Sequence, residues 1–101
     1  LGARTSDEDY SKILKNLKKP HLEYFKMFYA DTALFGSLSG TKCGLDFFVV
    51  ENVLFASDRP FDPEKGPGYI RETIRVIDAL PISDENRQKI YEGNARRLLK
   101  L

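Results

Sequence analysis

The chain has 101 residues, of which 42% are hydrophobic and 31% are charged. This length and composition predict one small globular domain and exclude a fibrous or intrinsically disordered chain. The 16 basic and 15 acidic residues leave a net charge of +1, which excludes a general electrostatic attraction to nucleic acid or to an anionic membrane.

Membrane insertion and disulfide bonding are also excluded as organising features. The longest uninterrupted apolar run, at 47–50, has four residues, whereas a membrane-spanning helix needs about 20. We therefore expect a soluble protein. Cys43 is the single cysteine, so no intrachain disulfide can form, and a reducing, cytoplasmic location is expected. The start of the chain has no pattern of a retained signal peptide.

The N-terminal third predicts two helices and a strand. Ser6 is a suitable N-cap, and the acidic residues at 7–9 favour the positive end of a helix. The apolar stripe of this helix would be Tyr10, Ile13, Leu14 and Leu17. A second helix is expected over 20–26, with Pro20 in its first turn. The aromatic run at 28–30 then predicts a strand.

The middle of the chain predicts a helix, a strand and a loop. Leu38, Leu45 and Phe48 share one helical face, which favours a helix over 37–48 despite two glycines. The apolar residues that follow predict a strand over 52–57. Segment 61–68 contains two prolines and two glycines, and we therefore expect an irregular loop over the end of that strand.

The C-terminal third is predicted to be helical. Ile70, Ile74 and Ile77 have the i, i+4, i+7 spacing of one helical face, and Pro81 closes that segment. Ser83 is expected to cap another helix. Gly93 would end this helix in the left-handed conformation. Asn94 would then cap a last short helix over 95–99.

Alternating strands and helices predict an α/β fold with parallel strands joined by right-handed crossovers. Two strands bury too little surface to make a complete sheet. We therefore expect residues 1–101 to form a single partial domain of a larger structure.

An acidic residue ends the second predicted strand. Asp58 follows the apolar run that begins at Val53 and precedes a loop that contains Pro60. In parallel α/β folds the C-terminal ends of the strands carry the catalytic residues. An aspartate before such a loop is also common as a turn or helix-cap residue, and these nine residues, 53–61, leave both interpretations open.

Three motifs in order resemble a known family. They are FYADTAL at 28–34, VLFASDRPF at 53–61 and GNARRLL at 93–99. They are similar to the closing motifs of the amidohydrolase-related metal-dependent enzymes, in the aminocarboxymuconate-semialdehyde decarboxylase-like and resorcylate decarboxylase-like branch. The resemblance implies the seventh strand, the eighth strand and the C-terminal helix of a (β/α)8 TIM barrel. The chain would be the C-terminal portion of that barrel, about its last two βα units plus the terminal helices.

The resemblance implies a metal-dependent hydrolase or decarboxylase, the latter a lyase, that acts on a small carboxylic or cyclic substrate. Asp58 would bind a divalent cation, expected to be zinc, and is a possible general base. Arg59 stands where relatives commonly have an aromatic residue, and it is a candidate for binding a substrate carboxylate. Its alternative partners are Asp62 and Glu64 at the surface.

Two departures from the family pattern limit what this chain does alone. The family also needs a His-x-His pair and further histidines, whereas this chain has only His21, which we expect at the surface or at a helix start. The 101 residues alone are therefore expected to be inactive. Val49 stands where relatives usually have glycine, and a β-branched residue there is expected to strain or reshape the turn.

Other residues carry weaker signals. Cys43 is expected to be a half-buried structural cysteine. Asp31 and Thr32, near the end of the first strand, are candidates for lining the same catalytic mouth as Asp58, at the C-terminal end of the strands. The alternative to an enzyme is a non-catalytic α/β module that binds a protein partner through exposed strand edges. We expect a small-molecule substrate and self-association or a homo-oligomer, with no nucleic-acid or membrane partner.

Overall fold

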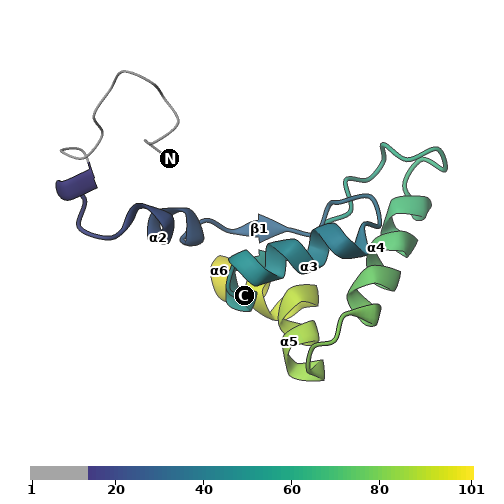
Figure 1. The fold of residues 1–101 in the computed structure, drawn as a ribbon. Coiled ribbons are helices and arrows are strands. Elements are labelled where there is room, and N and C mark those ends of the chain that lie inside the picture. Colours follow the sequence, from purple (N-terminus) through teal and green to yellow (C-terminus); the bar gives the residue numbers. More distant parts are fainter. Residues whose placement is uncertain (1–13) are drawn as a thin grey trace, which may run out of the picture.

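The computed structural model describes residues 14–101, in which helices surround a short two-stranded sheet (Figure 1). Most of the first predicted helix, with its Ser6 cap, lies outside the described residues, and the remaining positions of its stripe, Leu14 and Leu17, are exposed. The elements are α2 (His21–Lys26), β1 (Ala30–Asp31), α3 (Leu38–Phe47), the 3-10 helix η2 (Val50–Asn52), β2 (Val53–Leu54), α4 (Pro67–Ala79), α5 (Asp84–Gln88), the π-helical segment η3 (Lys89–Gly93) and α6 (Asn94–Leu99).

The two strands pair in parallel, as predicted. Ala30 lies opposite Val53 and Asp31 lies opposite Leu54. Helix α3 lies between the strands in the chain and makes the crossover that parallel pairing requires. The α/β character of the chain is therefore confirmed for the described residues.

Both strands are shorter than predicted. The Phe28 N–H donates to the Phe25 carbonyl at 3.2 Å, so the aromatic run continues the turn after α2 instead of beginning a strand. Phe28 and Tyr29 are exposed, and the strand predicted over 28–30 is wrong except at its last residue. β2 does not fill the predicted range 52–57, because residue 52 ends η2 and no strand among residues 14–101 pairs with the backbone after residue 54.

Helix α3 begins where the sequence predicts. Ser37 is its N-cap, and the Ser37 hydroxyl accepts a hydrogen bond from the Gly40 N–H at 3.0 Å. Leu45 and Phe48 pack against the core, which confirms two of the three positions of the predicted face. Val49 has φ −69° and ψ 145°, an ordinary extended conformation. The strain expected at Val49 is absent, because this backbone does not need a glycine.

Helix α4 begins inside the segment predicted as loop. Pro67 is the first helical residue, a position where the missing N–H removes no hydrogen bond. Gly66 before it has φ 134°, a conformation that favours glycine. The loop predicted over 61–68 therefore ends at Gly66. Ile74 is 39% exposed, so it does not belong to the buried face that its spacing predicted. The buried residues of the helix are Gly68, Thr73, Val76 and Ile77.

Residues 84–99 form one continuous helical segment, here called the C-terminal arm. The break predicted at Gly93 is wrong, because Gly93 has helical angles of φ −59° and ψ −43°. Asn94 is helical as well and completely buried, so it is not the predicted N-cap. The Asn94 N–H donates to the Lys89 carbonyl, five residues earlier, and this π-helical bond leaves the Ile90 carbonyl free for another donor.

The C-terminal arm covers one edge of β2. The Ile90 carbonyl accepts the Phe55 N–H at 3.0 Å, and the Asn94 side-chain amide donates to the Val53 carbonyl at 2.9 Å. Successive residues of a strand direct their backbone groups to opposite edges. The Leu54 carbonyl accepts from Thr32 beside β1. The arm therefore occupies the edge of β2 that faces away from β1.

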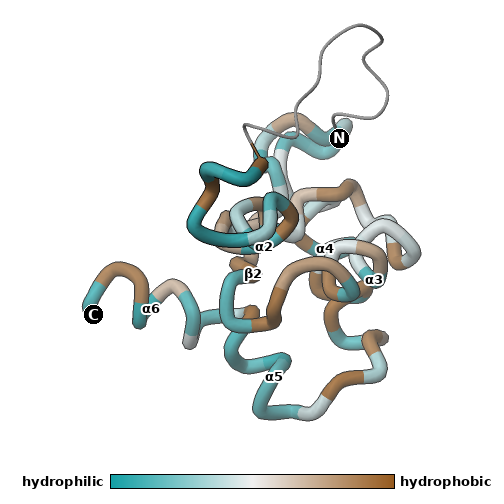
Figure 2. The backbone as a smooth tube through the Cα atoms, turned by 60° about the vertical axis from the view of Figure 1, so that its left-hand side comes forward, coloured by the Kyte–Doolittle hydropathy of each residue, from teal (hydrophilic) through white to brown (hydrophobic). Residues whose placement is uncertain are grey.

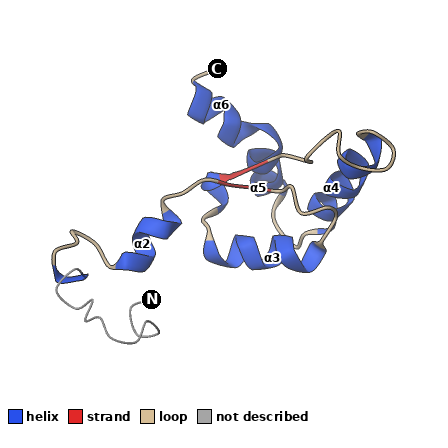
Figure 3. Cartoon of the chain, turned by 90° about the horizontal axis from the view of Figure 1, so that it is seen from above, coloured by secondary structure: helices blue, strands red, loops and turns tan. Residues whose placement is uncertain are grey.

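The hydrophobic core lies between β2 and its covering helices. Val53, Ile77 and Ile90 are its buried centre. Partly buried side chains pack around them: Leu45, Phe48, Val50, Phe55, Ile82 and Tyr91. Figure 3 shows the two strands between α3 and α6. Helix α5 has the polar sequence DENRQ, is teal in Figure 2 and contains no buried residue.

Helix α2 extends away from the other helices (Figure 1). None of its residues is buried. Exposed apolar side chains gather on and after it: Leu22, Phe25, Met27 and Phe28. No helix among residues 14–101 has an apolar stretch long enough to cross a membrane.

Candidate functional site

Asp58, the acid that the sequence predicts at a strand end, follows β2 with residues 55–57 between them. It is exposed, and its carboxylate makes no hydrogen bond or ion pair with the residues that the structure describes. Its backbone has φ 64°, in the left-handed region. A left-handed conformation costs free energy for a residue with a Cβ atom, although aspartate tolerates it better than most, and such residues cluster at functional sites.

The backbone on both sides of Asp58 is held by hydrogen bonds. After it, the Phe61 N–H donates to the Asp58 carbonyl at 3.2 Å and closes a turn. Before it, the Thr32 hydroxyl donates to the Ala56 carbonyl at 2.8 Å and accepts from the Ala56 N–H at 3.0 Å. The chain therefore turns at Asp58 between two fixed points.

The C-terminal ends of both strands lie at the same end of the sheet, because the strands are parallel. Asp31 is exposed there, and its carboxylate accepts the Ala33 N–H at 2.9 Å. Thr32 is only 3% exposed and contacts Ala56. Its side chain therefore joins the strand ends instead of lining an open mouth.

Arg59 is exposed and forms no ion pair with a residue in 14–101. The alternative pairing with Asp62 or Glu64 is wrong. Glu64 pairs with Arg71 at 2.6 Å, and Asp62 is buried with backbone partners. A Cβ atom at Gly66 would lie 2.8 Å from the Arg59 Cγ atom, so the glycine leaves room for the arginine side chain.

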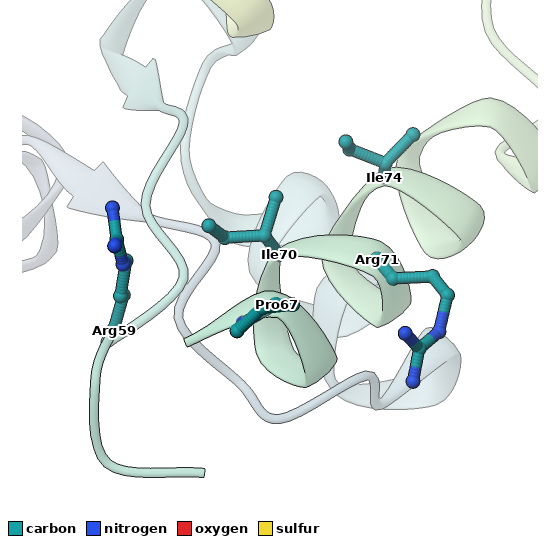
Figure 4. Close-up of a pocket in the computed structure, with 5 residues that line it drawn as sticks. All are labelled: Arg59, Pro67, Ile70, Arg71 and Ile74. Carbon is teal, nitrogen blue, oxygen red and sulfur yellow. The ribbon is translucent and has the colours of Figure 1, made fainter. Parts of the chain in front are cut away.

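A groove of about 580 Å³ lies beside this arginine (Figure 4). Pro67, Ile70 and Ile74 give it an apolar lining, with Arg59 and Arg71 at its borders. In Figure 4 Arg71 points away from the side that Arg59 occupies. The groove thus combines an apolar surface with the guanidinium of Arg59, which has no ion-pair partner in the described part of the chain, and Asp58 is the neighbour of Arg59 in the sequence.

Asp62 organises the loop between Asp58 and α4. Its two carboxylate oxygens accept the N–H groups of Gly66 and Tyr69, each at 2.8 Å. Burial raises the pKa of Asp62, but backbone hydrogen bonds, led by those from Gly66 and Tyr69, together with the charge of Arg71, outweigh burial and hold the pKa below its usual value. This helix cap was not predicted from the sequence, although an aspartate four residues before Gly66-Pro67 is its signal.

Asn94 is the second residue whose role was missed. Its side-chain amide donates to the carbonyls of Val50 at 2.7 Å and Val53 at 2.9 Å. Arg97 donates to the Asn94 side-chain oxygen at 3.1 Å and also to the Glu51 carbonyl. These bonds hold the segment that enters β2, the strand that leads to Asp58.

The residues in 14–101 do not complete a metal centre. No group of three or more His, Cys, Asp or Glu side chains in that range could hold a metal ion. His21 begins α2 and is half-buried. Cys43 is exposed, so the expectation of a half-buried structural cysteine is wrong. Asp58 fits a metal as one oxygen donor, because its carboxylate has no other partner in the described part of the chain, but it cannot hold a cation alone.

Comparisons with known proteins agree on one group of relatives. A family model described as amidohydrolase matches residues 43–101. The 2-keto-4-carboxy-3-hexenedioate hydratase of Sphingobium sp. (strain NBRC 103272 / SYK-6) is 38% identical over 89 residues, which cover 81% of this chain and 26% of that protein. The chain therefore spans about a quarter of the length of this curated relative.

A solved structure matches most of the chain. The crystal structure of a 2,6-dihydroxybenzoate decarboxylase complexed with 2,6-dihydroxybenzoate superposes with a TM-score of 0.65 and 24% sequence identity. The match covers 92% of this chain and 29% of that one. At this level of identity the likeness shows a shared fold.

Proposed function

Since this chain belongs to the amidohydrolase family, we propose that it contributes Asp58 as a metal ligand to a metal-dependent hydrolase or decarboxylase. The observation that carries the proposal is the position of Asp58, exposed and unpaired within the described residues at the C-terminal end of a parallel strand. The cation would be divalent, with zinc as the first candidate, and would supply Lewis-acid chemistry when bound. Asp58 itself would also act as a general base.

We propose further that residues 1–101 are one partial domain, the C-terminal portion of a (β/α)8 barrel. The parallel pair and its helical crossover support this, as does the 29% coverage of the decarboxylase chain. The outer edge of β1 has no strand partner among residues 14–101 and is available to a further strand. Cys43, the lone cysteine, supports a cytoplasmic location.

The mass of the polypeptide that the host produces tests the barrel proposal. The 101 residues have a mass of 11.6 kDa, whereas a complete barrel of about 250 residues would weigh about 25–30 kDa. A mass in the larger range is the expected result. A natural product of 11.6 kDa would contradict the barrel proposal.

Arg59 is the proposed partner of a substrate carboxylate. Its guanidinium has no ion-pair partner in the described part of the chain, and the groove beside it is lined by Pro67, Ile70 and Ile74. A guanidinium binds a carboxylate through two parallel hydrogen bonds, and an apolar wall suits a ring or a hydrocarbon chain. The relatives are named for carboxylated compounds, a hexenedioate and a benzoate. A small carboxylic substrate is therefore the proposed class.

The metal role of Asp58 is tested in the polypeptide as its host produces it. We expect Asp58→Asn to lower the bound metal per protein molecule and to abolish turnover, because an amide is a poor substitute for a carboxylate ligand. Asp46→Asn is the matched control, since Asp46 is exposed on α3 and remote from this strand end in the chain. Metal analysis and activity are measured together. Full metal content and full rate in Asp58→Asn would refute the proposal.

Arg59 is tested through the KM. Arg59→Gln should raise the KM for a carboxylate substrate, and Arg59→Lys should recover only part of the loss, because lysine lacks the planar fork. Arg96→Gln removes an exposed arginine that pairs with Glu92 and serves as the control. An unchanged KM in Arg59→Gln would remove Arg59 from the substrate site.

A second candidate function is association with a partner or with a second copy. The exposed apolar side chains of α2 favour it, because Leu22 and Phe25 are more than two-fifths exposed. Light scattering of the host-made polypeptide and of Phe25→Asp tests this candidate. A higher mass for the wild type than for the variant supports association through α2, and equal masses contradict it.

A further inference from the structure

We propose that Thr32 is a positioning residue for Asp58. Its buried hydroxyl holds the peptide of Ala56, two residues before Asp58, and thereby sets where the chain delivers the carboxylate. The inference rests on the proposed function, in which Asp58 is a metal ligand.

The Thr32 hydroxyl continues the pairing of the strands beyond the end of their backbone ladder. The last backbone hydrogen bond between the strand segments in the described range runs from the Thr32 N–H to the Leu54 carbonyl, at 3.1 Å. The hydroxyl then donates to the Ala56 carbonyl at 2.8 Å and accepts the Ala56 N–H at 3.0 Å. A hydroxyl has one donor and two acceptor sites. Thr32 uses its donor site and one acceptor site on a single residue, Ala56, of the segment beside it.

Burial makes this pair of hydrogen bonds specific. Thr32 is 3% exposed, so water does not readily replace its hydroxyl. Removal of the hydroxyl would leave the N–H and the carbonyl of Ala56 without this partner, at a cost in free energy. The side chain of valine has the shape of threonine without the hydroxyl, and the side chain of serine has the hydroxyl without the methyl group.

The conformation of Asp58 explains why the preceding residues must be held. A left-handed φ of 64° persists only where the surrounding structure determines it. The turn bond from the Phe61 N–H to the Asp58 carbonyl fixes the loop side. The Thr32 hydroxyl fixes the strand side, so the acid lies between two anchored points.

Zinc affinity of the host-made polypeptide tests the proposal, with zinc titrated in competition with a chelator. Thr32→Val should weaken zinc binding by about 10- to 100-fold, the range for groups that orient a metal ligand. Thr32→Ser should stay close to wild type, because it keeps the hydroxyl. Thr73→Val is the matched control, since Thr73 is a buried threonine whose hydroxyl has no partner in the described structure, and its zinc affinity should not change.

Amide hydrogen exchange of the metal-free polypeptide is the second readout. The Ala56 amide should be protected in the wild type and should exchange faster in Thr32→Val. If the wild-type Ala56 amide exchanged as fast as a solvent-exposed amide, the proposal would be overturned even where Thr32→Val failed to fold. Wild-type zinc affinity in a folded Thr32→Val protein, together with loss of zinc in Asp58→Asn, would overturn it while the proposed function stood. Undiminished zinc binding in Asp58→Asn would refute the proposed function, and with it the positioning of a metal ligand.

Discussion

The side-chain amide of Asn94 donates to the Val53 carbonyl at 2.9 Å, so the last helix is bound to the first residue of β2. The same amide donates to the Val50 carbonyl at 2.7 Å. One completely buried side chain therefore satisfies two carbonyls on the segment that leads toward Asp58.

Loss of this amide should destabilise the fold. We expect Asn94→Ala to lower the free energy of unfolding by about 2–3 kcal/mol, because two carbonyls lose their hydrogen-bond donor at a buried position. Chemical denaturation measures the change. Asn86→Ala is the control, since Asn86 is half-buried on α5 and its side chain makes no hydrogen bond within the described residues. Equal losses for both variants would contradict the role given to Asn94.

Asp62 should make the free energy of unfolding depend on pH in the acidic range. Its folded-state pKa is lowered, so its contribution is fully present above the usual value of 3.8 and disappears as the pH falls through the lower folded value. Asp62→Asn should therefore be less stable than wild type near neutral pH, and the difference should shrink as the pH falls below 3.8. Unfolding midpoints over a pH series measure it. A difference that stayed constant with pH would argue against the cap.

Tyr91 should ionise at a higher pH than an ordinary tyrosine. Burial raises the pKa of Tyr91 to about 12, and the hydrogen bond that its hydroxyl donates to Asp78 at 2.8 Å acts in the same direction. The folded state favours the neutral phenol, so this contribution is full below the ordinary pKa of 10.0 and is lost as the pH rises through about 12. The ultraviolet titration of wild type minus that of Tyr91→Phe should show one phenol with a midpoint near that value. A midpoint near 10.0 would contradict the prediction.

The cap of α3 should be worth about 1 kcal/mol. Ser37→Ala removes the hydroxyl that accepts the Gly40 N–H and should lower the free energy of unfolding by that amount. Ser39→Ala is the control within the same helix, because Ser39 is exposed and alanine favours helix. Chemical denaturation should show a loss for the first variant and no loss for the second. A loss of stability in Ser39→Ala with none in Ser37→Ala would show that Ser37 is not the cap.

The candidate site could be predicted in part. An apolar run that stops at an acid predicts that Asp58 follows a strand directly; in the structure Asp58 follows β2, but residues 55–57 lie between them. The partners of Asp62 could not be assigned from the sequence, because Arg59 lies three residues away and is an equally suitable partner for the carboxylate. The exposure of Ile74 was also missed, since helical spacing identifies a face but does not say what covers it.

Signals that act within one helical turn predicted part of the helical structure from the sequence alone. Ser83, predicted to cap a helix, is the N-cap of α5, and Pro81, predicted to close the preceding segment, follows α4. Tertiary structure decided where the strands end, why Gly93 continues a helix and which edge of β2 is covered. The reason is distance in the chain: Asn94 bonds to Val53, 41 residues earlier, and Thr32 bonds to Ala56, 24 residues later. Only the folded chain brings those groups together, and burial then makes their hydrogen bonds decisive over local preference.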